Sequence, residues 1–424
     1  MRRAAQTAAV AIVTTLALAG CGSTTAGGGG SSDSAGVPFG ASKAEYQAAF
    51  ADLDQITLIT QTAGAPGTIT SKYFEEYQEA VTDWSGGKIE FETNFSYSVA
   101  PATEVSDAVA DGRLDMSYTI PAYQPEELAA SNALIDMSIT AEQTPLVGLL
   151  QLMGWSFESS LASEPIRAEF EKIGLYPLLP VYALGPDVIA CSSPRSTLAE
   201  LKGASARMGT RLNAPQFNAL GIEGVSLSVQ EIYEALQRGV IDCTTSGPLS
   251  LALNGSVEVA PHVRYVPTTG FAGGFASLVI NQSVFESLPL PARQLLHDRL
   301  DVFVEAQINS GMGAEMDLLV QSEKYGGTVE AFEDDVTAAL EDANAGIIEG
   351  ARSELAGVED PATFVDDAQS TMESWLDTVV GLGYDPAIGY QEYGQWYQSR
   401  TDGDLDAFLD KLFSGDVAKA NRPS

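Results

Sequence analysis

The chain has 424 residues, with 57 acidic against 22 basic side chains and a formal net charge of −35. This length and a hydrophobic content of 45% suffice for two or three folded domains and exclude a wholly disordered or fibrous chain. So acidic a molecule repels polyanions, which makes nucleic acid and anionic membrane surfaces poor partners, and we expect no binding to nucleic acid.

Residues 1–20 are typical of a signal peptide. Arg2 and Arg3 precede an apolar run over 8–19, which is shorter than the roughly 20 residues of a transmembrane helix. The run ends in Leu-Ala-Gly before Cys21 and so resembles a bacterial lipobox. We therefore expect lipidation at Cys21 and a place in the cell envelope, anchored by lipid outside the cytoplasmic membrane. The alternative is a plain secretory signal with an incidental cysteine.

Residues 21–54 are predicted to be a lipidated flexible tether, rich in Gly, Ser and Thr, that ends in a short helix. From there strands and helices alternate, which favours an α/β fold with a mainly parallel sheet. The expected strands are 56–60, 88–93 and 113–116, and the expected helices 42–53, 70–82 and 103–111. Further on we expect helices at 144–153 and 164–172, strands at 176–183, 188–190 and 276–280, and helices at 291–320, 336–355, 363–380 and 405–413.

A short internal repeat appears at a spacing of 127 residues. Glu, Ala, Gly and Asp of the stretch 104–115 recur in the stretch 231–242. Each copy predicts a helix that stops at a Gly, followed by a short strand with an Asp, and Ser228 with Glu231 forms a capping box. Two lobes with related cores are the prediction, and chance recurrence of a helix-stop pattern is the alternative.

Cys191 and Cys243 are the cysteines that remain if Cys21 carries lipid. In an oxidising compartment they are candidates for a disulfide, and two buried small side chains are the alternative.

Residues for catalysis are scarce. The two histidines, His262 and His297, lie far apart in the sequence, and no nucleophile elbow, zinc spacing, phosphate loop or dinucleotide fingerprint is present. We therefore predict no enzyme. Binding is favoured instead, because ligands of open α/β sheets lie beyond the carboxyl ends of the strands. The loops expected there are polar and aromatic; they hold Gln61, 95–97, Tyr118 and 244–246.

Two stretches carry a family resemblance. Residues 201–210 read LKGASARMGT, and residues 231–242 read EIYEALQRGVID. Together they resemble the extracytoplasmic solute receptors of TRAP transporters, of the dicarboxylate-receptor type, whose pattern is Leu-Lys-Gly-x-Lys-x-Arg before a helix with Tyr-x-Ala-Leu-Gln-x-Gly-x-x-Asp. Matches at 85–89, 111–116, 279–281 and 288–289 extend the resemblance over about residues 55–300.

The resemblance implies a two-lobed, periplasmic-binding-protein-like clamp of mixed sheets flanked by helices, with a helical C-terminal region. It assigns Arg207 to the ligand carboxylate, which a planar guanidinium binds through two hydrogen bonds. A surface Arg207 bonded to a nearby acid is the alternative, and Arg211 is a competitor for the role. With Arg207 we place Gln61, Thr244 and Ser246 at the ligand; Tyr118, Tyr123 and Tyr233 cover it or simply pack.

The sequence also departs from the family pattern. Many relatives have a second arginine near the position of Asp187, so a dicarboxylate held by two arginines is doubtful here. The Glu with which some relatives bind a metal is missing after Cys243, and we expect neither metal nor cofactor. The prediction is a hydroxyl-rich pocket for a small organic acid.

The predicted lobes exchange chain segments: 55–183 with 272–310 form one, and 184–271 with 311–424 the other. The predicted function is capture of a small organic acid outside the cytoplasm and its delivery to a TRAP-type membrane permease. A ligand-sensing receptor subunit with the same clamp and, further off, a secreted enzyme are the alternatives.

Overall fold

The computed structural model describes residues 35–401 and 403–424. The predicted signal peptide, the lipidation site Cys21 and most of the predicted tether lie outside the described residues. None of the helices among the described residues combines the length and the apolar composition that a membrane span needs.

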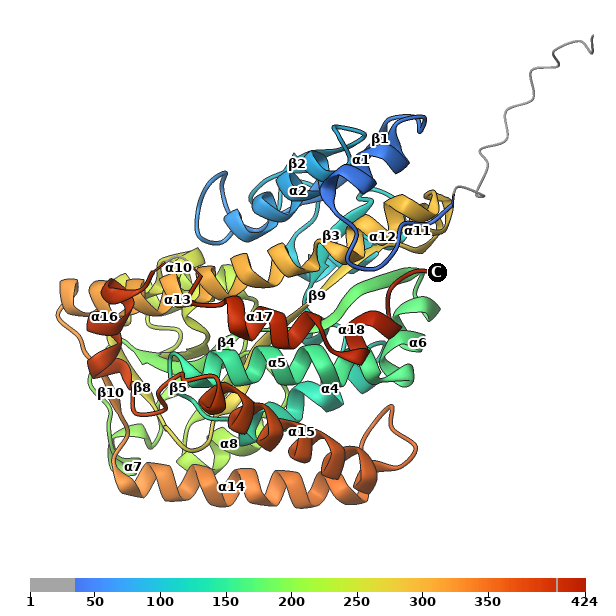
Figure 1. The fold of residues 1–424 in the computed structure, drawn as a ribbon. Helices are drawn as coiled ribbons and strands as arrows, with labels where there is room; N and C mark the ends of the chain where they lie inside the picture. The colour runs from blue at the N-terminus through green and yellow to red at the C-terminus, as the bar shows by residue number, and fades with distance from the viewer. Residues whose placement is uncertain (1–34, 402) are drawn as a thin grey trace, which may run out of the picture.

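Eighteen α-helices are described, and they surround two sheets (Figure 1). The helices are α1 (Lys43–Phe50), α2 (Lys72–Trp84), α3 (Val105–Ala110), α4 (Ala129–Asp136), α5 (Val147–Ala162), α6 (Glu164–Lys172), α7 (Leu198–Leu201), α8 (Asn213–Leu220), α9 (Ile232–Gln237), α10 (Pro248–Asn254), α11 (Gln282–Ser287), α12 (Leu290–Asp298), α13 (Leu300–Lys324), α14 (Asp334–Ser353), α15 (Pro361–Gly381), α16 (Tyr390–Ser399), α17 (Asp406–Phe413) and α18 (Asp416–Ala420). Short 3-10 helices are η1 (Ala102–Glu104), η2 (Pro121–Tyr123), η3 (Met137–Thr140), η4 (Val229–Glu231) and η5 (Ser256–Glu258). The helix predicted over 291–320 is instead two helices, because Arg299 leaves helical geometry (φ −94°, ψ 8°) between α12 and α13.

The first sheet, called sheet A, begins with three parallel strands. Its order is β2-β1-β3-β9-β4, with β9 antiparallel to both β3 and β4. These strands are β1 (Ile56–Gln61), β2 (Ile89–Asn94), β3 (Met116–Thr119), β4 (Leu175–Cys191) and β9 (Phe271–Asn281). Sheet A is therefore mixed rather than mainly parallel.

The second sheet, sheet B, repeats this plan. Strand β5 pairs in parallel with β6 and β7, and β7 lies antiparallel to the last residues of β4. Strand β8 joins β10 to β4. The strands new to this sheet are β5 (Ser205–Met208), β6 (Glu223–Ser226), β7 (Cys243–Ser246), β8 (His262–Tyr265) and β10 (Val329–Ala331).

The two copies of the sequence repeat occupy equivalent places in the two sheets. In each, a 3-10 helix and a short α-helix end before a left-handed glycine, Gly112 (φ 81°) or Gly239 (φ 68°). A carboxylate then fixes the neighbouring strand: Asp115 Oδ2 accepts from Ile59 N (2.7 Å), and Asp242 Oδ2 accepts from Ser205 N (2.9 Å). The predicted capping box is present.

Strand β4 belongs to both sheets. The two strands predicted at 176–183 and 188–190 are one strand of 17 residues, whose pairing with β9 shifts register between 183 and 187 around Gly185 (φ 118°). The chain thus passes between the sheets without leaving a strand, and the predicted lobe boundary at 183 falls inside it. The division into lobes stays a prediction.

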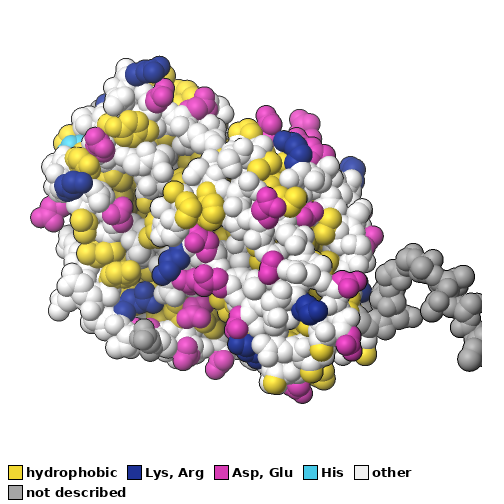
Figure 2. Space-filling model, turned by 90° about the horizontal axis from the view of Figure 1, so that it is seen from above, with side chains coloured by type: hydrophobic (Ala, Val, Ile, Leu, Met, Phe, Trp, Pro, Cys, Tyr) yellow, Lys and Arg dark blue, Asp and Glu magenta, His cyan; other side chains and the backbone are white. Residues whose placement is uncertain are grey.

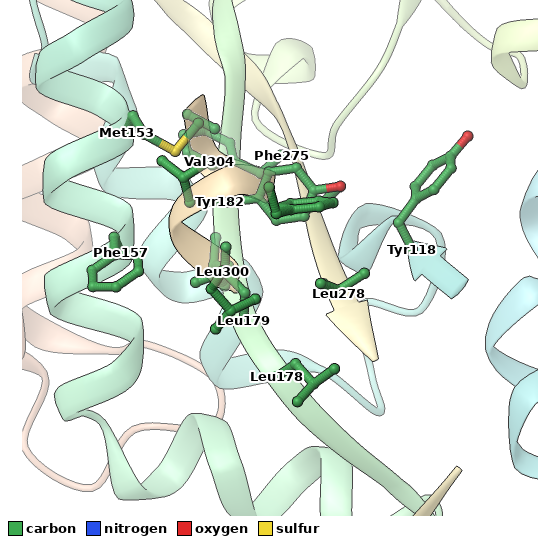
Figure 3. Close-up of a cluster of buried hydrophobic side chains, with 14 of the residues drawn as sticks. Tyr118, Met153, Phe157, Leu178, Leu179, Tyr182, Phe275, Leu278, Leu300 and Val304 are labelled. Atoms are coloured by element: carbon green, nitrogen blue, oxygen red, sulfur yellow. The ribbon is translucent and has the colours of Figure 1, made fainter. Parts of the chain in front are cut away.

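The largest core packs on sheet A and reaches the C-terminal helices. Helix α15 lies along α5 (Figure 1), and this packing joins segments that the sequence assigned to different lobes. A Cβ on Gly154 would come within 2.2 Å of the Trp375 ring, so the absence of a side chain lets the two helices approach. Figure 3 shows Met153 of α5 next to Val304, on the side where Tyr182 and Phe275 lie.

Cys191 and Cys243 form a disulfide, which is one of the two alternatives that the sequence left open. They are directly opposed residues of β4 and β7, and both are buried in the sheet B core. On the outside, acidic side chains are spread over the face seen in Figure 2 together with Lys and Arg. The charge is thus carried by a solvated surface, while few charged side chains are buried.

Candidate ligand-binding site

A cavity lies where strands of both sheets end. Its empty space is about 820 Å³, including the part that opens to solvent. The lining is mostly aromatic and apolar, with few polar groups. It consists of Ala63, Thr70, Tyr73, Tyr97, Tyr118, Ile120, Ala122, Tyr123, Ile135, Leu184, Asp187, Arg207, Gly209, Thr210, Val229, Ser246, Gly247, Leu249, Ser250, Leu253, Gly273, Gly274 and Phe275.

Arg207, on β5, is buried, with 6% of its surface exposed. Two backbone carbonyls hold the guanidinium: Nε donates to Leu227 O (3.0 Å) and Nη1 to Thr245 O (2.9 Å). Gly209 permits this pose, since a Cβ there would lie 2.8 Å from Nη1. Among the described residues, no carboxylate lies within 4.0 Å of Arg207, and none accepts from Nη2. The guanidinium is therefore fixed in place, while its Nη2 stays available to bind a ligand.

Asp187, on β4, is the second charged group of the cavity and is 5% exposed. Its Oδ1 accepts from Gly274 N (3.1 Å). Burial raises the pKa of this carboxyl to about 7, against the opposing effect of the Arg207 charge. No nitrogen of Arg207 comes within 4.0 Å of its oxygens, so the two charges face one cavity without pairing.

Tyrosines form the opposite wall. The hydroxyls of Tyr97 and Tyr118 share a hydrogen bond (2.6 Å), and the Tyr73 ring packs edge-on to Tyr118 at 6.4 Å. Burial raises the pKa of all three phenols, which stay neutral at physiological pH. In Figure 3 Tyr118 stands apart from the aliphatic cluster, with its hydroxyl pointing away from it.

The loop that carries Tyr97 is strained. Ser96 and Tyr97 both have positive φ (56° and 54°), which is uncommon for residues with side chains. Gln61 holds the loop, because its Oε1 accepts from Val99 N (2.8 Å) and Ala100 N (3.0 Å), and its Nε2 donates to Ala100 O (2.9 Å). Gln61 therefore positions Tyr97 and does not itself line the cavity.

The other predicted residues divide in two. Tyr123 lines the cavity, and its Oη accepts from Val229 N (3.2 Å); Ser246 lines it as well. Thr244 does not, since its hydroxyl donates to Thr245 O (3.2 Å) inside the sheet. Tyr233 lies in a neighbouring cleft with Gln230 and Glu234.

Arg211, the competitor of Arg207, is not among the lining residues. It pairs with Asp136 at the end of α4 (Nη2–Oδ2 2.5 Å). Burial raises the Asp136 pKa to about 6, although the arginine acts to lower it. This ion pair joins α4 to the loop that follows β5.

Several lining residues escaped the sequence reasoning. Tyr73 lies on the helix predicted at 70–82, where helical periodicity does not separate a cavity residue from a core residue, and Asp187 drew notice only for the arginine that it replaces. The apolar residues of α10 and β9, such as Leu249 and Phe275, carry no signal that separates cavity from core. The pocket is consequently more aromatic and less hydroxyl-rich than predicted.

Metal-ligating groups do not converge here. In the part of the chain that the structure describes, no group of three or more His, Cys, Asp or Glu residues is arranged to hold a metal ion. The cavity presents one guanidinium, one carboxyl and a wall of neutral phenols, which are groups suited to binding a ligand.

Known proteins resemble this chain in sequence and in fold. The family model for bacterial extracellular solute-binding protein, family 7 (DctP), matches residues 60–353. A solute-binding protein of Albidiferax ferrireducens is 23% identical over 267 residues, which cover 60% of this chain and 74% of that protein.

Solved structures share the fold. A marine metagenome TRAP solute binding protein specific for aromatic acid ligands, in complex with 3-hydroxybenzoate, has a TM-score of 0.65 at 19% identity and covers 76% of this chain and 99% of that one. The periplasmic ectoine-binding protein of a Halomonas elongata TRAP-transporter has a TM-score of 0.64 at 17% identity, covering 75% and 99%. A TRAP solute binding protein of Rhodoferax ferrireducens with copurified benzoate gives 0.63 at 17%, covering 77% and 100%. The family match spans more than half of the chain, and the chain belongs to the bacterial extracellular solute-binding proteins of family 7.

Proposed function

We propose that this protein captures a small organic acid, whose carboxylate binds Arg207, and delivers it to a TRAP-type membrane permease. One observation carries the proposal: a buried guanidinium, held by two carbonyls, has no carboxylate within 4.0 Å in the described part of the chain. A buried charge without a counter-ion is costly. A bound carboxylate supplies that counter-ion through the free Nη2.

The rest of the cavity suits an acid with an apolar body. Phenol and phenyl rings of Tyr73, Tyr118 and Phe275 line it, and such rings pack against flat apolar ligands. Relatives of the same fold were solved with 3-hydroxybenzoate and with benzoate. Delivery to a permease is supported by the family match and by solved structures of the same fold that are named as TRAP solute binding proteins.

Titration calorimetry with benzoate and with benzamide tests the carboxylate. Benzoate is expected to bind and the neutral amide to bind at least roughly 10-fold more weakly, because a charge-assisted hydrogen bond contributes about 1.5–3 kcal/mol. Arg207→Ala should abolish measurable binding. Arg211→Ala removes an equal charge outside the cavity and should retain it. Equal affinity of Arg207→Ala and the unmodified protein would refute the mechanism.

The lipid anchor is a separate part of the proposal, supported by the lipobox-like sequence before Cys21. Expressed with its leader in a bacterium, the protein should fractionate with membranes, and its N-terminal peptide should carry the mass of acyl chains. Cys21→Ser should release it. A protein that is soluble with Cys21 intact would contradict the anchor and leave the ligand proposal standing.

A further inference from the structure

Two charged side chains of opposite sign line the cavity, and neither neutralises the other. Arg207 and Asp187 come from different strands, β5 and β4, and stay more than 4.0 Å apart. Buried charges of opposite sign normally pair. Here each is held separately by backbone groups, the arginine by two carbonyls and the carboxyl by the Gly274 amide.

The Asp187 carboxyl can accept more hydrogen bonds than the protein supplies. Gly274 N bonds Oδ1 of Asp187, while no described residue donates to Oδ2. The residue lines the cavity and is over nine-tenths buried, so little of the carboxyl meets bulk water. An acceptor in this position calls for a donor on the ligand.

The surroundings of Asp187 contain few groups that titrate. Arg207 on β5 is the charged neighbour, and the phenols of Tyr73, Tyr97, Tyr118 and Tyr123 complete the titratable lining. Strands β7 and β9 and helix α10 bring only Ser, Gly and apolar residues. A pH effect on binding near neutrality therefore reports on Asp187, whose pKa burial raises to about 7.

We propose that the ligand is zwitterionic: its carboxylate binds Arg207, and a cationic N–H group binds Asp187. This rests on the proposed function and narrows it. Such a ligand neutralises both charges inside a dry site, and the tyrosine rings favour a cation further. A dicarboxylate is excluded, since its second carboxylate would meet Asp187 with the same sign. A zwitterion also avoids the repulsion that an anion meets from a chain of net charge −35.

Four acids that share one ring test the proposal: benzoate, hydroxybenzoate, (aminomethyl)benzoate and benzenedicarboxylate, each used as the meta and the para isomer where it is substituted. Calorimetry at pH 8 is expected to give the tightest binding for one aminomethyl isomer, roughly 10-fold or more above benzoate. Benzenedicarboxylate should bind at least roughly 10-fold more weakly than benzoate. From pH 6 to pH 8 the aminomethyl acid should gain roughly 10-fold as Asp187 loses its proton, while benzoate should not gain.

Asp187→Asn keeps an oxygen for the Gly274 amide and removes the charge. It should bring the aminomethyl acid and benzoate to within about 3-fold of each other. Asp136→Asn is the matched control, a buried acid outside the cavity lining; it should change all affinities by a common factor.

The outcomes separate the two proposals. If benzoate binds but the aminomethyl acids gain nothing over it at either pH, the zwitterion is wrong and capture of an acid stands. The zwitterion is also wrong if Asp187→Asn prefers the aminomethyl acid over benzoate as strongly as the unmodified protein does. If none of the acids binds the unmodified protein, the proposed function fails together with this inference. The ligand series and its pH dependence need no variant, so a misfolded Asp187→Asn leaves the test intact.

Discussion

Sheet A and sheet B are built on one plan, β2-β1-β3-β9 beside β6-β5-β7-β4, yet they line the cavity with different chemistry. Segments around sheet A supply phenols: Tyr97 follows β2, and Tyr118 lies on β3. Strands of sheet B supply Arg207 and Ser246. The frame of each half is fixed by the same device, an Asp that accepts a neighbouring strand's amide. The two halves therefore share a backbone plan and differ in the side chains that they bring to the cavity.

The largest expected effect comes from removing a covalent bond that only sheet B contains. Removing the disulfide with Cys191→Ala and Cys243→Ala should cost about 4 kcal/mol of unfolding free energy, since the bond closes a separation of 52 residues. Urea unfolding measures the loss. Ligand preference should be unchanged, because the bond lies in the core and not in the cavity lining. A double variant as stable as the unmodified protein would show that the stability of sheet B does not depend on the disulfide.

The next effect concerns the aromatic half. Tyr118→Ala removes a ring from the cavity wall and should weaken benzoate binding by about 2–3 kcal/mol, the contribution of burying one aromatic side chain. Tyr118→Phe loses only the bond to Tyr97 and should stay within about 3-fold of the unmodified affinity, since the ring remains. Calorimetry of both variants decides. A loss as large in the Phe variant would mean that the hydroxyl, and not the ring, holds the ligand.

A third effect is the pH dependence of stability that Asp187 causes. The folded-state pKa of Asp187 lies above its unfolded value, so folding takes up a proton, and this stabilisation is lost as pH rises towards and through 7. Between pH 5 and pH 8 the unmodified apo-protein should lose about 2 kcal/mol that Asp187→Asn does not lose. The difference in melting temperature, variant minus unmodified protein, should accordingly increase with pH. A difference independent of pH would mean that the carboxyl does not titrate in this range.

The smallest effect tests the shared frame. Asp115→Ala and Asp242→Ala each deprive a strand amide of its side-chain acceptor, and each should cost about 1 kcal/mol of stability. Chemical denaturation of the two variants should give similar losses. A large loss in one and none in the other would show that the two copies are alike in sequence and not in energetics.

The strand–helix rhythm and the repeat could be predicted, because periodicity and glycine stops are local signals. The unity of β4 could not, since Gly185 and Pro186 imitate a loop and only pairing with β9 keeps the strand extended. Among the candidate residues, Arg207 was found through a motif. Thr244 was misplaced because one strand offers several hydroxyls, and only packing decides which of them faces the cavity.

Strand β4 has a mechanical consequence. Any rotation of one sheet against the other must be absorbed by bending β4, where register shifts at 183–187 leave the ladder irregular. Asp187 stands two residues past Gly185, at the end of this compliant stretch. A bend in this stretch therefore moves the acceptor relative to the residues of sheet A that line the cavity, such as Tyr118. The bend of β4 thus sets how far apart the two walls of the cavity stand.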